Sequence, residues 1–102
     1  MNNSILIIED DARLREALYR IATKEGYAVT AVERGEEALE KASENDYSLI
    51  ITDLKLPGIG GMEVMQSIRS TSAHTSFIVI TAFASVDTAV EAMKNGAEDY
   101  LT

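Results

Sequence analysis

The sequence contains no cysteine, which excludes disulfides, thiolate metal sites and cysteine nucleophiles. Basic residues are also few, since 9 Lys and Arg stand against 17 Asp and Glu, and the net charge of −8 argues against nucleic-acid binding by this chain alone. No apolar stretch is long enough to span a bilayer, and no charged and then apolar leader opens the chain. We therefore expect a cytoplasmic protein that contacts neither nucleic acid nor membrane.

The remaining composition is that of a globular protein. The chain has 102 residues, of which 46% are apolar and 25% charged, enough for one hydrophobic core but not for two. It has no repeat, low-complexity segment or proline-rich linker. We predict one domain over residues 1–102.

Short apolar segments alternate with helical patterns along the whole chain. We predict strands at Ser4–Ile8, Ala28–Val32, Leu49–Thr52, Phe77–Thr81 and from Asp99 onward, and helices at Ala12–Glu25, Glu36–Glu44, Met62–Ser70 and Val86–Asn95. Gly26 and Gly96 are placed to end the first and last of these helices in the left-handed conformation. Repeated βα units with short connections predict a parallel sheet with helices on both faces, a doubly wound α/β fold.

The predicted helices carry apolar stripes that need cover. The stripe of the first helix comprises Leu14, Ala17, Leu18, Ile21 and Ala22, and the methionines at core-facing spacing are Met62, Met65 and Met93. A five-stranded sheet of this type usually carries a fifth helix, which these residues do not supply. We expect apolar side chains beside the first helix to stay exposed, so that these residues self-associate or are less stable than a longer version.

Acidic residues follow two of the predicted strands. The apolar run 5–8 leads directly into Glu9 and Asp10, and the run 49–52 leads directly into Asp53. Such runs are typical of strands buried on both faces of a parallel sheet, whose carboxyl ends line the edge where ligands bind. The three acids should therefore meet in one crevice, where carboxylates raise one another's pKa unless a cation neutralises them. Hard oxygen ligands suit Mg²⁺, which we predict as the cofactor.

The single acid after the third strand predicts a nucleophile. A carboxylate facing a metal-held phosphoryl group can attack phosphorus and form an aspartyl phosphate, although Asp53 taken alone would more often begin a turn. Thr81 should bring a hydroxyl to the same edge, and Ala82 beside it leaves room for a phosphoryl group. Asp11 is interpreted as a helix N-cap rather than a metal ligand. Tyr100, from pattern alone, is a partly buried strand residue.

The sequence resembles the receiver domain of bacterial two-component response regulators. The resemblance covers the whole chain and rests on residues Ile5 to Asp11, Leu49 to Pro57, Gly61 to Glu63 and Ile80 to Ala82. It implies a flavodoxin-like sheet of strand order 2-1-3-4-5, magnesium-dependent phosphorylation by a sensor histidine kinase, and a switch that controls an attached output domain. The segment from Ile80 to Ala97 looks most like receivers of enhancer-binding AAA+ activators, which implies transcription activation.

The resemblance also implies a metal site. Asp53 would be the phosphoacceptor and a metal ligand, Asp10 would bind Mg²⁺ directly, and Glu9 would bind it through water. The backbone carbonyl of Lys55 would be a further ligand. The protein would then be a signalling domain that catalyses only its own phosphorylation and dephosphorylation, with a homodimer as a further candidate assembly.

The same resemblance implies a switch, and one part of it is missing. Thr81 would be the switch hydroxyl that moves to the phosphoryl oxygen, Ala82 would contact the phosphoryl group through its backbone, and Tyr100 would swing inward behind them. Family receivers place a lysine directly after the residue matching Thr102, followed by a proline turn and a fifth helix. We therefore expect a receiver domain cut before its final helix, either trimmed or part of a longer chain.

Three other functions compete with this one. A flavin-binding flavodoxin shares the sheet order, but its phosphate loop needs hydroxyls and N–H groups where Glu9, Asp10 and Asp11 place three negative charges, so we reject it unless the isolated protein is yellow. An aspartyl-phosphate phosphohydrolase usually has a second acid two residues after the nucleophile, where this chain has Lys55. A non-phosphorylated receiver-like interaction module would not need the acids or Thr81.

Overall fold

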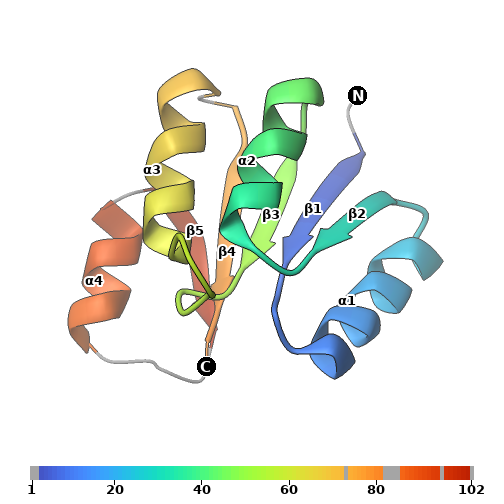
Figure 1. The fold of residues 1–102 in the computed structure, drawn as a ribbon, viewed down its shortest axis with the longest axis horizontal. Helices are drawn as coiled ribbons and strands as arrows, with labels where there is room; N and C mark the ends of the chain where they lie inside the picture. Colours follow the sequence, from blue (N-terminus) through green and yellow to red (C-terminus); the bar gives the residue numbers. More distant parts are fainter. Residues whose placement is uncertain (1–2, 73, 82–85, 95, 102) are drawn as a thin grey trace.

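The computed structural model describes residues 3–72, 74–81, 86–94 and 96–101, with the side chains of residues 86–88, 92, 99 and 100 left aside. The strands are β1 Ser4–Ile8, β2 Ala28–Val32, β3 Leu49–Thr52, β4 Ser76–Ile80 and β5 Ala97–Leu101, and the helices are α1 Ala12–Lys24, α2 Gly35–Glu44, α3 Gly61–Thr71 and α4 Val86–Lys94. All strand pairs are parallel, and the sheet order is β2-β1-β3-β4-β5 (Figure 1). The predicted doubly wound fold is confirmed.

The helix ends follow the capping residues of the sequence. The Asp11 side chain accepts hydrogen bonds from the backbone N–H groups of Arg13 and Leu14 at 2.9 and 3.1 Å, so the prediction that Asp11 caps α1 is confirmed. Gly26 and Gly96, which follow α1 and α4, have φ of 96° and 97°, the left-handed conformation predicted for them. None of the helices in the described part of the chain combines the length and apolar character that a membrane span requires.

β4 spans Ser76–Ile80 rather than the predicted Phe77–Thr81, and β5 also begins earlier than predicted. β5 starts at Ala97, which pairs with Phe77, whereas the sequence predicted a start at Asp99. The pairing then shifts so that Ile78 lies opposite Asp99, and Glu98 is left as an extra, exposed residue in the strand. A polar residue at a bulge breaks the apolar pattern that marks a strand, which explains the error.

The main core lies between the sheet and the helices α2 and α3, which lie side by side in Figure 1. Its fully buried strand residues are Leu6, Ile8, Ile50, Phe77 and Val79, and the helix residues packed with them include Ala38, Val64, Met65 and Ile68. Met65 is in this core and Met62 is partly buried against it, as predicted. Met93 is 46% exposed on α4, so its predicted core position is wrong. Periodicity identifies the apolar face of a helix but not what covers that face.

The opposite face of the sheet is less covered. Side chains alternate along a strand, so Ile51 of β3 and Ile78 of β4 point away from the main core, and both are only half-buried. Among the described helices, α1 packs on this face, mainly against β1 and β2. The predicted apolar stripe of α1 is present, but Leu14 and Ile21 are 38% and 63% exposed. An apolar strip therefore lies open beside α1.

Candidate metal centre

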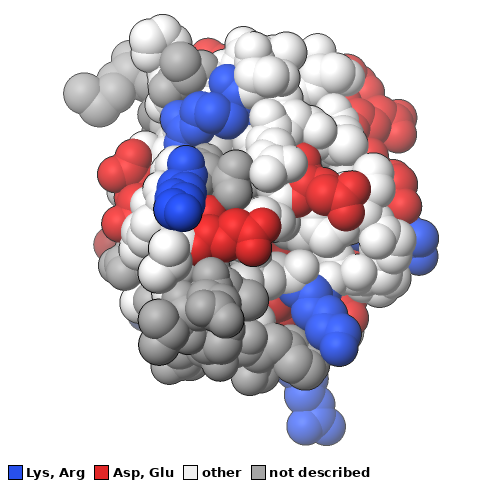
Figure 2. All heavy atoms as spheres, turned by 90° about the vertical axis from the view of Figure 1, so that its left-hand side faces the viewer, with Lys and Arg blue, Asp and Glu red and all other residues white. Residues whose placement is uncertain are grey.

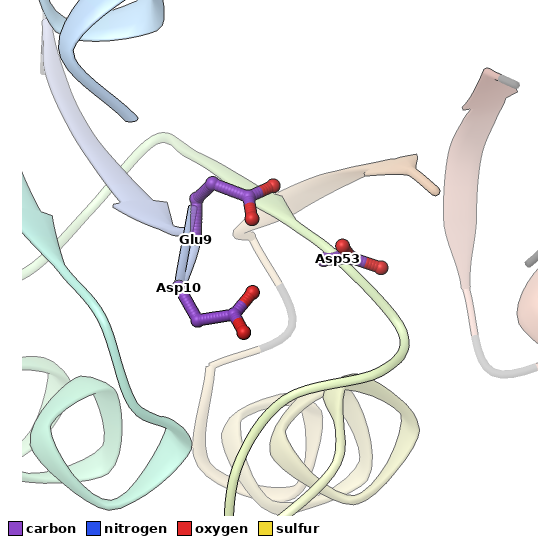
Figure 3. A group of neighbouring side chains, drawn as sticks. All are labelled: Glu9, Asp10 and Asp53. Atoms are coloured by element: carbon purple, nitrogen blue, oxygen red, sulfur yellow. The ribbon is translucent and has the colours of Figure 1, made fainter. Parts of the chain in front are cut away.

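The carboxyl ends of two adjacent strands bring the three predicted acids together. Glu9 and Asp10 follow β1, Asp53 follows β3, and the Asp53 N–H donates to the Ile8 carbonyl at 3.3 Å. One carboxylate oxygen of each acid lies within 4.8 Å of the others. Figure 3 shows Glu9 and Asp10 directing their carboxylates toward Asp53. The predicted convergence of the acids is confirmed, whereas their roles stay predictions.

The electrostatics of this cluster favour a cation. Only 3% of Glu9 is exposed, and burial, with the nearby charges of Asp53 and Asp10, raises the pKa of Glu9 to about 7. The Asp11 N–H, 3.0 Å from Glu9 Oε2, offsets part of this effect. Ionising all three carboxylates is therefore costly without a counterion. A divalent cation with a preference for carboxylate oxygens fits this donor set.

Arg15 of α1 supports the cluster from behind. Its guanidinium donates to the backbone carbonyl of Glu9 at 2.9 Å and lies 3.9 Å from the Glu33 carboxylate, at the end of β2. The Arg15 side chain is 25% exposed. It thus joins the ends of β1 and β2 to α1 and fixes the peptide between Glu9 and Asp10. Nothing in the sequence predicted a role for Arg15.

The loop after β3 begins at Asp53 and returns close to it. The Lys55 N–H donates to Asp53 Oδ1 at 3.2 Å, and the Gly61 N–H donates to the Leu54 carbonyl at 2.9 Å. A side chain at Gly61 would collide with the Asp53 backbone carbonyl, which explains the glycine at the start of α3. The Lys55 backbone therefore lies beside the predicted nucleophile, while its carbonyl stays a predicted ligand.

The switch residues are only partly placed. Thr81 directly follows β4 at the same edge of the sheet as Asp53, is 3% exposed, and donates its N–H to the Leu101 carbonyl at 2.9 Å. Tyr100 lies in β5 opposite Val79, but its side chain is outside the described part, as are residues Ala82 and Thr102. The structure thus bears on the position of Thr81 alone.

The sequence matches the response regulator receiver domain family over residues 5–102. The chain belongs to this family. It is 40% identical over 98 residues to the uncharacterized transcriptional regulatory protein YkoG of Bacillus subtilis, which covers 96% of this chain and 43% of that protein. It is also 40% identical over 101 residues to the response regulator protein FleR of Pseudomonas aeruginosa, covering 99% of this chain and 21% of that protein. The chain thus spans less than half the length of these relatives.

Solved receiver structures have the same fold. A CheY-like receiver domain protein from Methanospirillum hungatei matches with a TM-score of 0.94 at 28% identity, over 99% of this chain and 81% of that one. A Burkholderia pseudomallei response regulator with a phosphorylated aspartic acid, a calcium ion and citrate matches with a TM-score of 0.92 at 31% identity, over 98% of this chain and 59% of that one. The response regulator protein TrrA of Thermotoga maritima, in complex with Mg²⁺-BeF, matches with a TM-score of 0.86 at 33% identity, over 100% of this chain and 86% of that one.

Proposed function

We propose that this receiver domain accepts a phosphoryl group on Asp53 from a sensor histidine kinase, in a magnesium-dependent reaction, and switches conformation to control an output domain. The observation that carries the proposal is the convergence of the Glu9, Asp10 and Asp53 carboxylates at one edge of the sheet. Relatives with a phosphorylated aspartic acid and with Mg²⁺-BeF support it. The domain is not a turnover enzyme and acts only on its own phosphorylation state.

The residues present suit a magnesium ion. Asp10, Asp53 and the Lys55 carbonyl would hold it directly, with Glu9 holding it through water. When bound, Mg²⁺ neutralises charge on the phosphoryl oxygens and so lowers the barrier to transfer. A calcium ion accompanies the phosphorylated aspartic acid of the Burkholderia pseudomallei relative, which supports a divalent cation here.

Asp53, Thr81 and Tyr100 would each have a separate role in phosphorylation and switching. Asp53 Oδ1 is engaged by the Lys55 N–H, which orients the carboxylate so that the other oxygen attacks phosphorus. The new O–P bond forms as the bond from phosphorus to the donor's nitrogen breaks. Thr81 would donate its hydroxyl to a phosphoryl oxygen, with the Ala82 backbone beside it. Tyr100 would follow Thr81 inward, which couples phosphorylation to the surface of β5.

The output of the switch is proposed to be transcription activation. The relatives HprR of Escherichia coli and ResD of Bacillus subtilis are transcriptional regulatory proteins, at 41% and 38% identity. The resemblance of the segment from Ile80 to Ala97 favours an enhancer-binding AAA+ output domain. On the face formed by α3 and α4, the described acidic and basic side chains are interspersed and form no basic patch (Figure 2). This supports the proposal that the output domain, and not the receiver domain, contacts nucleic acid.

Intact mass spectrometry tests the proposal. Incubation with Mg²⁺ and acetyl phosphate should add one phosphate to the wild-type protein, and the gain should disappear on chelation of the metal. Asp53→Asn should abolish the gain, with Asp46→Asn, an exposed acid outside the cluster, as the matched control. Phosphate that persists on another residue of Asp53→Asn would show that the nucleophile is wrongly assigned.

A further inference from the structure

The tip of the loop between β3 and α3 rests against the start of α2. Gly58 lies at this tip with φ of +75°, and a side chain there would collide with the carboxylate of Glu36 and come within 2.9 Å of the Arg34 guanidinium. Arg34 and Glu36 are themselves 3.6 Å apart. The loop tip is therefore covered by an ion pair from a different part of the chain.

The contact continues along the backbone at Ile59. The Glu36 backbone N–H, the nearby Arg34 charge and the Ile59 N–H favour the ionised form of the Glu36 carboxyl and lower its pKa. A side chain at Gly35 would lie 2.6 Å from the Ile59 carbonyl and 2.9 Å from Val64 Cγ2. Because Gly35 has no side chain, the start of α2 can lie directly against the backbone of the loop.

Lys55 lies between the two fixed points of this loop. At the base, the Gly61 N–H bonds the Leu54 carbonyl at 2.9 Å, and at the tip Glu36 covers Gly58. A short loop held at both ends has little freedom to rotate the peptides between them. The direction of the Lys55 carbonyl therefore depends on whether the tip is held.

We propose that Glu36, together with Arg34, positions the loop so that the Lys55 carbonyl can bind the metal ion. Glu36 is a positioning residue, because it acts through the loop and does not belong to the acid cluster. The inference rests on the proposed function, in which the Lys55 carbonyl is a Mg²⁺ ligand. An exposed ion pair stabilises a fold only weakly, so its loss should change magnesium affinity more than global stability.

Magnesium titrations of the metal-free protein, followed by the NMR signals of the loop amides, test the proposal. Glu36→Gln should raise the dissociation constant for Mg²⁺ roughly 5-fold, less than the loss of about 10-fold or more seen when a residue that touches a ligand is removed. Glu37→Gln is the matched control, because Glu37 is an exposed acid in the same first turn of α2 and loses the same charge. Its affinity should stay at the wild-type value.

Arg34→Gln separates positioning from simple charge effects. Removing a positive charge would tighten Mg²⁺ binding if long-range electrostatics alone mattered, whereas loss of the ion pair over Gly58 should weaken it. Arg34 precedes α2 but makes no side-chain capping bond, so the substitution costs no helix cap. Weaker binding in both Glu36→Gln and Arg34→Gln, with faster amide exchange at Gly58 and Ile59, supports the proposal.

Four results would overturn it. Equal weakening in Glu36→Gln and Glu37→Gln, or tighter binding in Arg34→Gln, would leave charge as the whole explanation. Wild-type affinity in Glu36→Gln, while the wild-type protein still binds Mg²⁺ and gains phosphate on Asp53, would overturn the positioning role and leave the proposed function intact. A wild-type protein that binds no Mg²⁺ would overturn both.

Discussion

Glu9 should destabilise the metal-free protein at neutral and alkaline pH. It is 3% exposed, and burial together with Asp53 and Asp10 raises its pKa from an ordinary 4.5 to about 7. The substitution Glu9→Gln removes the buried charge and keeps an oxygen that can accept the Asp11 N–H. We therefore predict that Glu9→Gln is more stable than the wild-type protein at pH 8 in the absence of metal.

The sign and size follow from the linkage between protonation and folding. A carboxyl whose pKa is higher in the folded state holds its proton more tightly there, so the free energy of unfolding falls as pH rises from 4.5 to about 7 and then levels off. The difference between the two pKa values corresponds to about 3 kcal/mol at pH 8. For a domain of this size that is on the order of 10 °C in melting temperature.

Thermal melts of both proteins in EDTA, from about pH 5 to pH 8, measure the effect. The two melting temperatures should be similar at low pH and separate as pH rises, because only the wild-type protein must ionise Glu9. Added Mg²⁺ should then stabilise the wild-type protein more than the variant at pH 8. Parallel curves across the whole range, or a variant that melts below the wild-type protein at pH 8, would refute the account of this carboxylate.

Other features of the structure lead to three further predictions. Asp10→Ala should weaken Mg²⁺ binding, followed by calorimetry, more than Glu9→Ala, because a direct ligand loses more than a water-mediated one; the reverse order would contradict the assigned roles. Gly61→Ala should lower the free energy of unfolding by at least about 1 kcal/mol, because its Cβ would collide with the Asp53 carbonyl. Urea denaturation should show this as a lower midpoint, and an unchanged midpoint would show that the loop shifts to make room. Ile21→Lys, on the open apolar strip beside α1, should reduce self-association of the 102-residue chain in sedimentation velocity. A wild-type chain that stays monomeric at high concentration would exclude contact through that strip.

The sheet and the acid cluster could be predicted because both depend on short-range pattern. The bounds of β1, β2 and β3 agree with the sequence to the residue, because each is a short run of mainly apolar and β-branched residues. Once these strands are parallel, Glu9, Asp10 and Asp53 must share an edge. The start of β5 was missed because Glu98 interrupts its pattern at a bulge.

Residues that act through the backbone were not predictable in the same way. An Arg or Glu on a helix is usually solvated, so nothing in the sequence distinguishes Arg15 or Glu36 from their charged neighbours. The partner of Arg15 is the carbonyl of Glu9, and Glu36 covers a glycine of a distant loop. Such partners carry no side-chain signal and are visible only after the chain has folded.

The order of strands in the sheet has a consequence for folding. β1 pairs with β2 on one side and with β3 on the other, and parallel neighbours can be joined only through a crossover, so these pairings are non-local and slow to form. The βαβ unit of β1, α1 and β2 contains Glu9 and Asp10, whereas Asp53 is brought beside them only by the pairing of β3 with β1. The repulsion among the three carboxylates therefore opposes that pairing in particular, and a cation that bridges the acids would favour it.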